Sequence, residues 1–82
     1  MSQLDVISKE ILTLLSKQYF EDPKTKLSFS IYDVPKEHQG VINAFLDGLI
    51  NEGFIEDYKQ SITGNFTVTI TKQCVLYFMT LN

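Results

Sequence analysis

The sequence predicts an α+β domain in which three main helices accompany a small antiparallel sheet. Three observations lead to this fold class. Apolar residues recur at helical spacing in three segments, residues 66–70 alternate apolar residues with threonine as a strand does, and a turn containing Gly64 precedes them. A length of 82 residues is that of one small domain, so we assign residues 1–82 to a single unit.

The first helix is predicted from Ser2 or Asp5 to about Tyr19. Its end follows from Pro23, because the residue before a proline avoids the helical region. After a polar connector, residues 27–31 alternate apolar and polar side chains, which is the period of a half-buried strand. The apolar positions expected on the inner face of the helix are Leu4, Ile7, Ile11, Leu14 and Leu15.

The middle of the chain is predicted to hold a turn and the second long helix. Residues 33–37 indicate a turn or a single helical turn, with a capping aspartate and a proline in its first turn. The helix is expected from about His38 to Asn51, before Gly53, which suits a left-handed C-terminal cap. Its inner stripe is expected to consist of Ile42, Phe45, Leu46 and Leu49.

The last third of the chain is predicted to form a hairpin and a final helix. Strands are expected over residues 54–59 and 65–71. They are joined by a turn over residues 61–65, in which a glycine or an asparagine takes a positive φ. A helix is expected over residues 72–81, capped by Thr71 and apolar on almost every side.

The charge balance restricts the class of partner. The chain has a formal net charge of −3, a pI near 4.9, and seven lysines but no arginine. Arginine supplies the bidentate fork that reads guanine and clamps phosphate. Its absence therefore counts against tight sequence-specific contact with DNA.

Composition also indicates a compartment. No apolar run approaches the roughly 18 residues needed to span a bilayer. The first five residues lack the basic start of a secretion signal, and Cys74 is the only cysteine, so no internal disulfide forms. We therefore expect a cytoplasmic protein with no membrane partner.

The order helix, short strand, turn, helix, strand, turn, strand, helix resembles the winged helix-turn-helix superfamily of small bacterial and phage regulators. The resemblance covers residues 4–81. Residues 49–55, Leu-Ile-Asn-Glu-Gly-Phe-Ile, look like the exit of the family's recognition helix. Residues 70–78 are similar to a common ending in which a threonine caps a helix after the wing, although Cys74 stands where glycine is usual. The family's second helix is missing or reduced to about one turn.

This resemblance implies a non-enzymatic, DNA-binding regulator of transcription, whose helix over residues 38–51 enters the major groove. Glutamine and asparagine amides pair bidentately with adenine, and lysines contact phosphates. On and before this helix the candidate contacts are Lys36, Gln39 and Asn43. On the wing side they are Lys59, Gln60, Thr63, Asn65 and Lys72. The alternative is an ordinary solvated face, because five carboxylates share the region: Glu37, Asp47, Glu52, Glu56 and Asp57.

The final helix predicts a homodimer. A helix that is apolar almost all round must bury two faces, and a domain of this size has one core to offer. The second face is then an exposed patch, and such patches mark interfaces. The alternative is that the core of the monomer covers both faces. The candidate interface residues are Leu12, Tyr77, Phe78, Met79 and Leu81.

We find no pattern of catalytic, metal-binding or cofactor-binding residues. His38 is the only histidine, and Cys74 lies in an apolar segment where cysteine behaves as a small hydrophobe. The second function class is therefore an acidic protein-interaction module on the same frame, such as an anti-repressor or an inhibitor. DNA binding ranks first on the sequence, and the charge over the middle helix and the wing discriminates between the two.

Overall fold

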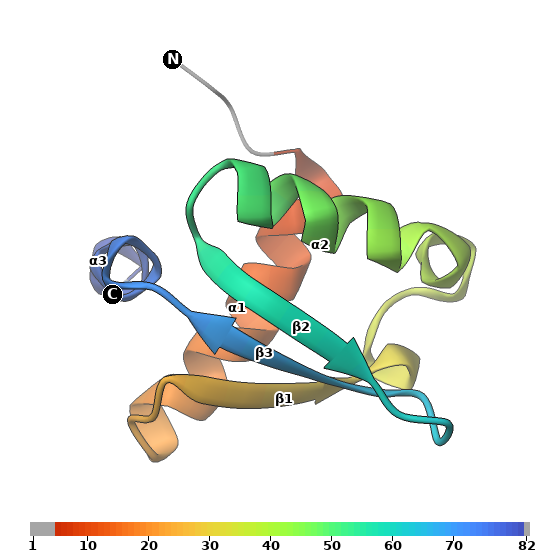
Figure 1. The fold of residues 1–82 in the computed structure, drawn as a ribbon, viewed down its shortest axis with the longest axis horizontal. Coiled ribbons are helices and arrows are strands. Elements are labelled where there is room, and N and C mark those ends of the chain that lie inside the picture. The colour runs from red at the N-terminus through yellow and green to blue at the C-terminus, as the bar shows by residue number, and fades with distance from the viewer. Residues whose placement is uncertain (1–4, 82) are drawn as a thin grey trace.

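A computed structural model describes residues 5–81. Within this range, three α-helices and a three-stranded antiparallel sheet form an α+β unit, as Figure 1 shows. The predicted fold class is confirmed at this level. In chain order the elements are α1 (Val6–Glu21), β1 (Lys26–Ser30), the 3-10 helices η1 (Ile31–Asp33) and η2 (Lys36–Val41), α2 (Ile42–Asn51), β2 (Ile55–Gln60), β3 (Asn65–Ile70) and α3 (Lys72–Thr80).

Helix α1 begins and ends where its local signals indicate. The Asp5 carboxylate caps the helix by accepting a hydrogen bond from the Ser8 backbone N–H at 2.7 Å. The helix runs two residues past its predicted end and stops at Glu21, just before the proline segment. The alternative start at Ser2, and Leu4 of the predicted stripe, lie outside the described residues. The fully buried apolar residues of this helix are Ile11, Leu12 and Leu15.

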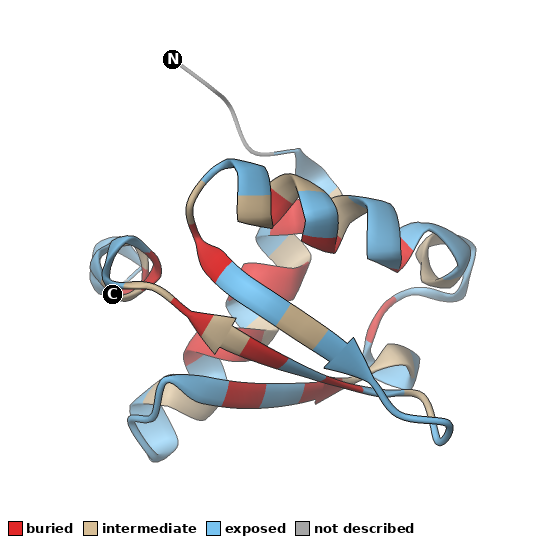
Figure 2. Ribbon diagram, in the orientation of Figure 1, coloured by how far each residue is buried: buried red, intermediate tan, exposed pale blue. Residues whose placement is uncertain are grey.

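The sheet has the strand order β1-β3-β2, and both neighbouring pairs are antiparallel. Alternate residues of a strand point to the same side, so one face carries the large apolar side chains. Phe29 of β1 lies opposite Phe66 of β3, and their rings stack with centroids 5.2 Å apart. Figure 2 shows the resulting alternation of buried and exposed residues along β1. The opposite face is polar and includes Ser28, Thr67 and Thr69.

The predicted turn after β1 is a 3-10 helix with its own cap. The Tyr32 backbone N–H donates to the Ser30 hydroxyl at 3.2 Å. The Ser30 backbone N–H donates in return to the Asp33 carboxylate at 3.4 Å. The prediction that Asp33 caps a turn over residues 33–37 is therefore wrong: Asp33 completes the capping box of η1, whose N-cap is Ser30, and η2 has no side-chain cap.

The predicted start of the second long helix at His38 is wrong. Residues 36–41 form η2, and α-helical geometry begins only at Ile42. Val41, the last residue of η2 and the N-cap of α2, has φ −117° and ψ 7°, outside the α region. Gly40 precedes this break, and glycine lowers helix propensity by about 1 kcal/mol relative to alanine.

Helix α2 presents one apolar stripe to the core, as predicted. Ile42, Leu46 and Leu49 are buried there. Phe45 is only partly buried and packs against this cluster. The stripe therefore depends mainly on the three aliphatic residues.

Gly53 ends α2 with the left-handed backbone that its sequence position predicts, at φ 86°. The Phe54 N–H donates to the Leu49 carbonyl at 3.0 Å, and the Gly53 N–H donates to the Ile50 carbonyl at 3.1 Å. This pair of bonds is the Schellman motif. A Cβ at Gly53 would also lie 2.8 Å from the Gln73 Oε1 atom, so the turn packs closely against α3.

The hairpin and final helix also follow the prediction within one residue at each end. Gly64 takes the positive φ of the turn, at 89°. The Thr71 hydroxyl accepts a hydrogen bond from the Cys74 N–H at 3.3 Å and donates to the Gly53 carbonyl at 2.6 Å. One threonine therefore caps α3 and attaches it to the end of α2.

The core thiol leads to a pH-dependent prediction. Burial raises the pKa of Cys74 from its ordinary 9.0 to about 12. The unfolded chain then loses the thiol proton first, so this stabilisation is complete below pH 9 and is lost as the pH rises toward 12. We expect the free energy of unfolding to fall by about 1 kcal/mol between pH 8 and pH 10.

Urea denaturation followed by circular dichroism at pH 7, 8, 9 and 10 measures this dependence. The matched variant, Cys74→Ala, lacks the titrating group and is expected to show a flatter profile over the same range. Equal pH slopes in the two proteins would contradict the assignment to Cys74.

Candidate interaction surface

Helix α2 is attached to β2 through one tyrosine. The Tyr58 hydroxyl donates a hydrogen bond to the Asp47 carboxylate at 2.8 Å and reaches the Asn43 carbonyl at 3.5 Å. The hydrogen bond to Asp47 raises the pKa of Tyr58, and burial acts in the same direction. These contacts hold α2 alongside β2, as Figure 1 shows. We refer to the exposed side of residues 36–65 as the α2–hairpin surface.

The α2 part of this surface exposes backbone at two glycines and lacks positive charge. Gly40, just before the helix, and Gly48 within it have no neighbouring atom within 4 Å of the position that a Cβ would take. Ala44 and Asn51 are exposed on the helix, and Asp47 is its charged residue. A partner can therefore approach close to the α2 backbone, and it meets a carboxylate rather than an ammonium group.

The hairpin tip is held by several hydrogen bonds. The Ser61 N–H donates to the Asn65 carbonyl at 2.8 Å, and the Asn65 N–H donates to the Ser61 hydroxyl at 3.2 Å. The Ile31 N–H donates to the Gly64 carbonyl at 2.8 Å, which attaches the tip to η1. Such a network favours one conformation of the tip before any partner binds.

This ordered tip exposes apolar side chains. Ile62 at its end is fully exposed, and Tyr32 of η1 is 76% exposed. The Tyr32 ring lies beside the tip, with one ring carbon 3.4 Å from the position of a Cβ on Gly64. Nothing in the helical or strand pattern indicates this pair in advance, because both residues lie between regular elements.

The predicted DNA contacts separate into groups. One group is exposed. It lies around the α2 N-terminus, the second half of β2 and the hairpin tip, and consists of Lys36, Asn43, Lys59, Gln60, Thr63 and Asn65. Lys72 stands at the other end of β3, and six strand residues span roughly 20 Å. The structure therefore places Lys72 away from the tip, and one contact patch does not include both.

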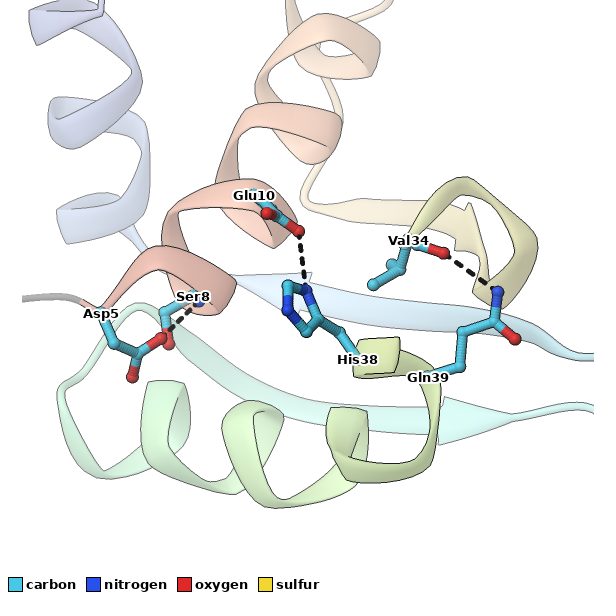
Figure 3. Close-up of polar contacts among 6 residues, drawn as sticks. All are labelled: Asp5, Ser8, Glu10, Val34, His38 and Gln39. Atoms are coloured by element: carbon cyan, nitrogen blue, oxygen red, sulfur yellow. Dashed lines mark hydrogen bonds and ion pairs between the residues drawn. The ribbon is translucent and has the colours of Figure 1, made fainter. Parts of the chain in front are cut away.

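Gln39 is already engaged within the fold. Its side-chain amide donates to the Val34 carbonyl at 3.0 Å, as Figure 3 shows, and the side chain is half-buried. An amide that satisfies a backbone carbonyl must break that bond before it pairs with adenine. Gln39 is therefore better described as a structural residue of η2.

The net charge of the protein falls within residues 36–65. Residues 36–65 carry two lysines and five carboxylates, all on exposed residues, which leaves −3. The remainder of the chain carries five lysines and five carboxylates and is neutral. The segment that holds most of the predicted DNA contacts is therefore acidic.

His38 connects η2 to α1. Its Nδ1 atom lies 3.4 Å from the Glu10 carboxylate, and both side chains are about two-thirds buried or more (Figure 3). Cys74, the other candidate for chemistry, is fully buried in the core. Among residues 5–81, no three or more His, Cys, Asp or Glu side chains gather to hold a metal ion.

The predicted dimer interface needs correction at two positions. Leu12 and Phe78 are fully buried in the monomer, so neither presents a surface to a second copy. Tyr77 is half-buried, with its ring 5.6 Å from that of Phe54. The predicted interface residues Met79 and Leu81 are exposed at the end of the chain described, as are Leu76 of α3 and Phe20 at the end of α1.

A periodic signal for Leu76 was present in the sequence. Cys74 and Phe78 are four residues apart and mark the buried stripe of α3, so Leu76 between them points away from the core. The all-round apolar character of this helix concealed that distinction.

Comparison of the chain with protein-family models, with curated proteins and with solved structures finds no match. Over the described range, 5–81, every helix is too short or too polar to cross a membrane.

Proposed function

We propose that this protein is a non-enzymatic protein-interaction module on a winged-helix-like frame, and that it binds a basic protein partner through the α2–hairpin surface. The concentration of the whole net charge of −3 on residues 36–65 carries this proposal. Charge of one sign on a surface steers a partner of the other sign and repels nucleic acid. This reverses the ranking made from sequence alone.

The winged-helix-like frame is supported by the element order and by the position of α2 beside the β2–β3 hairpin. In our proposal Ile62 of the α2–hairpin surface and Tyr32 of η1, which lies beside the hairpin tip, serve as apolar anchors. An exposed aromatic or aliphatic anchor on a preorganised loop contributes strongly when it enters a pocket, because little side-chain freedom is then lost. In our proposal the carboxylates of residues 36–65 orient the partner and raise the rate of encounter.

The proposal is tested by site-specific photo-crosslinking in cells of the source organism. A benzophenone side chain is placed at Ile62 or Ala44 on the proposed surface, and at Lys17 on α1 as the matched control; all three positions are exposed. We expect a discrete protein adduct from Ile62 and Ala44 and none from Lys17. Adducts of equal yield at all three positions, or none at Ile62 and Ala44, would remove the proposal.

A DNA-binding regulator is the second candidate. It is supported by the same frame and by the exposed residues Lys36, Asn43 and Lys59. Two phosphate contacts give a slope of only about −2 for the logarithm of affinity against the logarithm of salt concentration. A fluorescence titration with mixed-sequence duplex DNA at about 50 mM salt, repeated at higher salt, distinguishes the candidates. Saturable, salt-dependent binding at micromolar protein would favour DNA over a protein partner.

We further propose a homodimer through the exposed apolar residues of α3 and the end of α1, with Met79 at its centre. A cytoplasmic location belongs to the same proposal and rests on the single free cysteine, Cys74. The exposure of Leu76, Met79, Leu81 and Phe20 supports association of two copies.

A further inference from the structure

A groove of about 420 Å³ lies where the end of α1, the connector to β1 and the beginning of α3 meet. It is distant from the hairpin tip, because it adjoins the opposite end of β3. Its floor is apolar, and two lysines stand at its rim. Its apolar lining, here called the floor, includes Tyr19, Pro23, Ile70 and Val75, and the two lysines, here called the rim, are Lys24 and Lys72.

The floor of this groove is part of the packed structure. Ile70 is 3% exposed, and its backbone N–H donates to the Thr25 carbonyl at 2.8 Å, which fixes the connector against β3. The Tyr19 ring packs on that of Phe78 with centroids 5.5 Å apart. An apolar ligand therefore meets a surface that exists before binding.

The rim is positively charged. Lys24 has its Nζ atom 2.9 Å from the Asp22 carboxylate, but both side chains are about two-thirds exposed, so this pair is weak. Lys72 forms no ion pair with any of the residues that the structure describes. An anionic group at the rim can thus pair with the ammonium group of Lys72, which has no ion-pair partner among the described residues. It can share the ammonium group of Lys24 with Asp22.

A second groove in the same molecule provides a comparison. It has about 380 Å³, lies between α1 and the segment around η1, and has a similarly apolar lining that includes Val6 and Leu14. Its charged residues are Lys9, Glu10 and Asp33, so carboxylates outnumber lysine. The two grooves differ mainly in the sign of their rims.

We propose that the groove at the beginning of α3 binds small organic acids that consist of an apolar body, about the size of a naphthalene ring, and one carboxylate. The body lies on Tyr19, Pro23 and Val75, and the carboxylate pairs with Lys72 and Lys24. The apolar floor contributes most of the affinity and the lysines select the charge. This inference does not depend on the partner proposed for the α2–hairpin surface.

The test is a nuclear magnetic resonance titration of the ¹⁵N-labelled protein with 2-naphthoate and, in parallel, with the uncharged 2-naphthalenemethanol at low salt. We expect the largest amide shifts at Ile70 and Val75, and an affinity for the acid about fivefold higher than for the alcohol. Equal affinities for the two compounds, or shifts centred on Val6 and Leu14, would overturn the proposal.

Three variants sharpen the result. Lys72→Ala is expected to lower the affinity for naphthoate about threefold, because Lys24 retains the rest of the preference for the acid, and to leave that for the alcohol unchanged. Asp22→Asn is expected to raise the affinity for naphthoate about twofold, because it releases Lys24 and removes a repelling charge. Lys9→Ala, the control at the other groove, is expected to change neither. A Lys72→Ala protein that binds naphthoate as tightly as the unmutated protein contradicts the site; an unchanged amide spectrum without ligand shows that the variant is folded.

Discussion

Replacement of Phe66 by alanine is expected to lower the free energy of unfolding by about 3–5 kcal/mol. Phe66 is fully buried on the central strand, stacked on Phe29 and tilted against Tyr58 with ring centroids 6.4 Å apart. Its removal leaves a cavity lined by residues of all three strands. A small domain has a total stability of roughly 5–15 kcal/mol, so the variant is expected to be close to unfolding at 37 °C.

Urea denaturation followed by circular dichroism measures this loss. The control is Thr67→Val, at the next residue on the polar face of the same strand, which keeps the β-branched shape. We expect the control to change the unfolding free energy by less than about 0.5 kcal/mol. A loss below about 1 kcal/mol for Phe66→Ala would show that the inner face of the sheet is not the core.

The second large effect on stability is expected from Phe78→Glu. The same substitution at the neighbouring Met79 is expected to leave the domain folded. Phe78 is fully buried against Tyr19, whereas its neighbour Met79 is 53% exposed. A carboxylate without a partner in an apolar core costs several kilocalories per mole, so Phe78→Glu is expected to unfold the domain at neutral pH. At Met79 the same carboxylate remains in water and the fold is expected to persist.

Circular dichroism separates the two variants, and analytical ultracentrifugation adds the oligomeric state. If two copies associate through Met79, the unmutated protein sediments as a dimer and Met79→Glu as a folded monomer. A monomeric unmutated protein would end the dimer proposal. A folded Phe78→Glu protein would show that this side of α3 does not face the core.

Several elements could be predicted from sequence because their causes are local. The Asp5 and Thr71 caps and the turn at Gly53 depend on residues within a few positions along the chain. The alternation over residues 66–70 similarly predicted which face of β3 is buried. These signals act through backbone geometry and short hydrogen bonds, so no knowledge of distant residues is needed.

Other features depend on contacts between distant segments. Phe78 is buried because α1 packs on α3, and Gln39 is engaged because η2 places it against Val34. The predicted helix start at His38 overlooked the change from 3-10 to α-helical geometry at Val41, because the apolar stripe does not distinguish the two kinds of helix. In each case the sequence indicated an apolar or polar residue correctly but not the group that it would meet.

For the candidate site the division is similar. The net charge of −3 and the small number of lysines near α2 could be read from the sequence. Only the folded chain shows that Lys72 lies at the far end of β3 from the tip. Local interactions specify helices, turns and caps, whereas the neighbours of a side chain follow from how those elements pack, which no short stretch of sequence encodes.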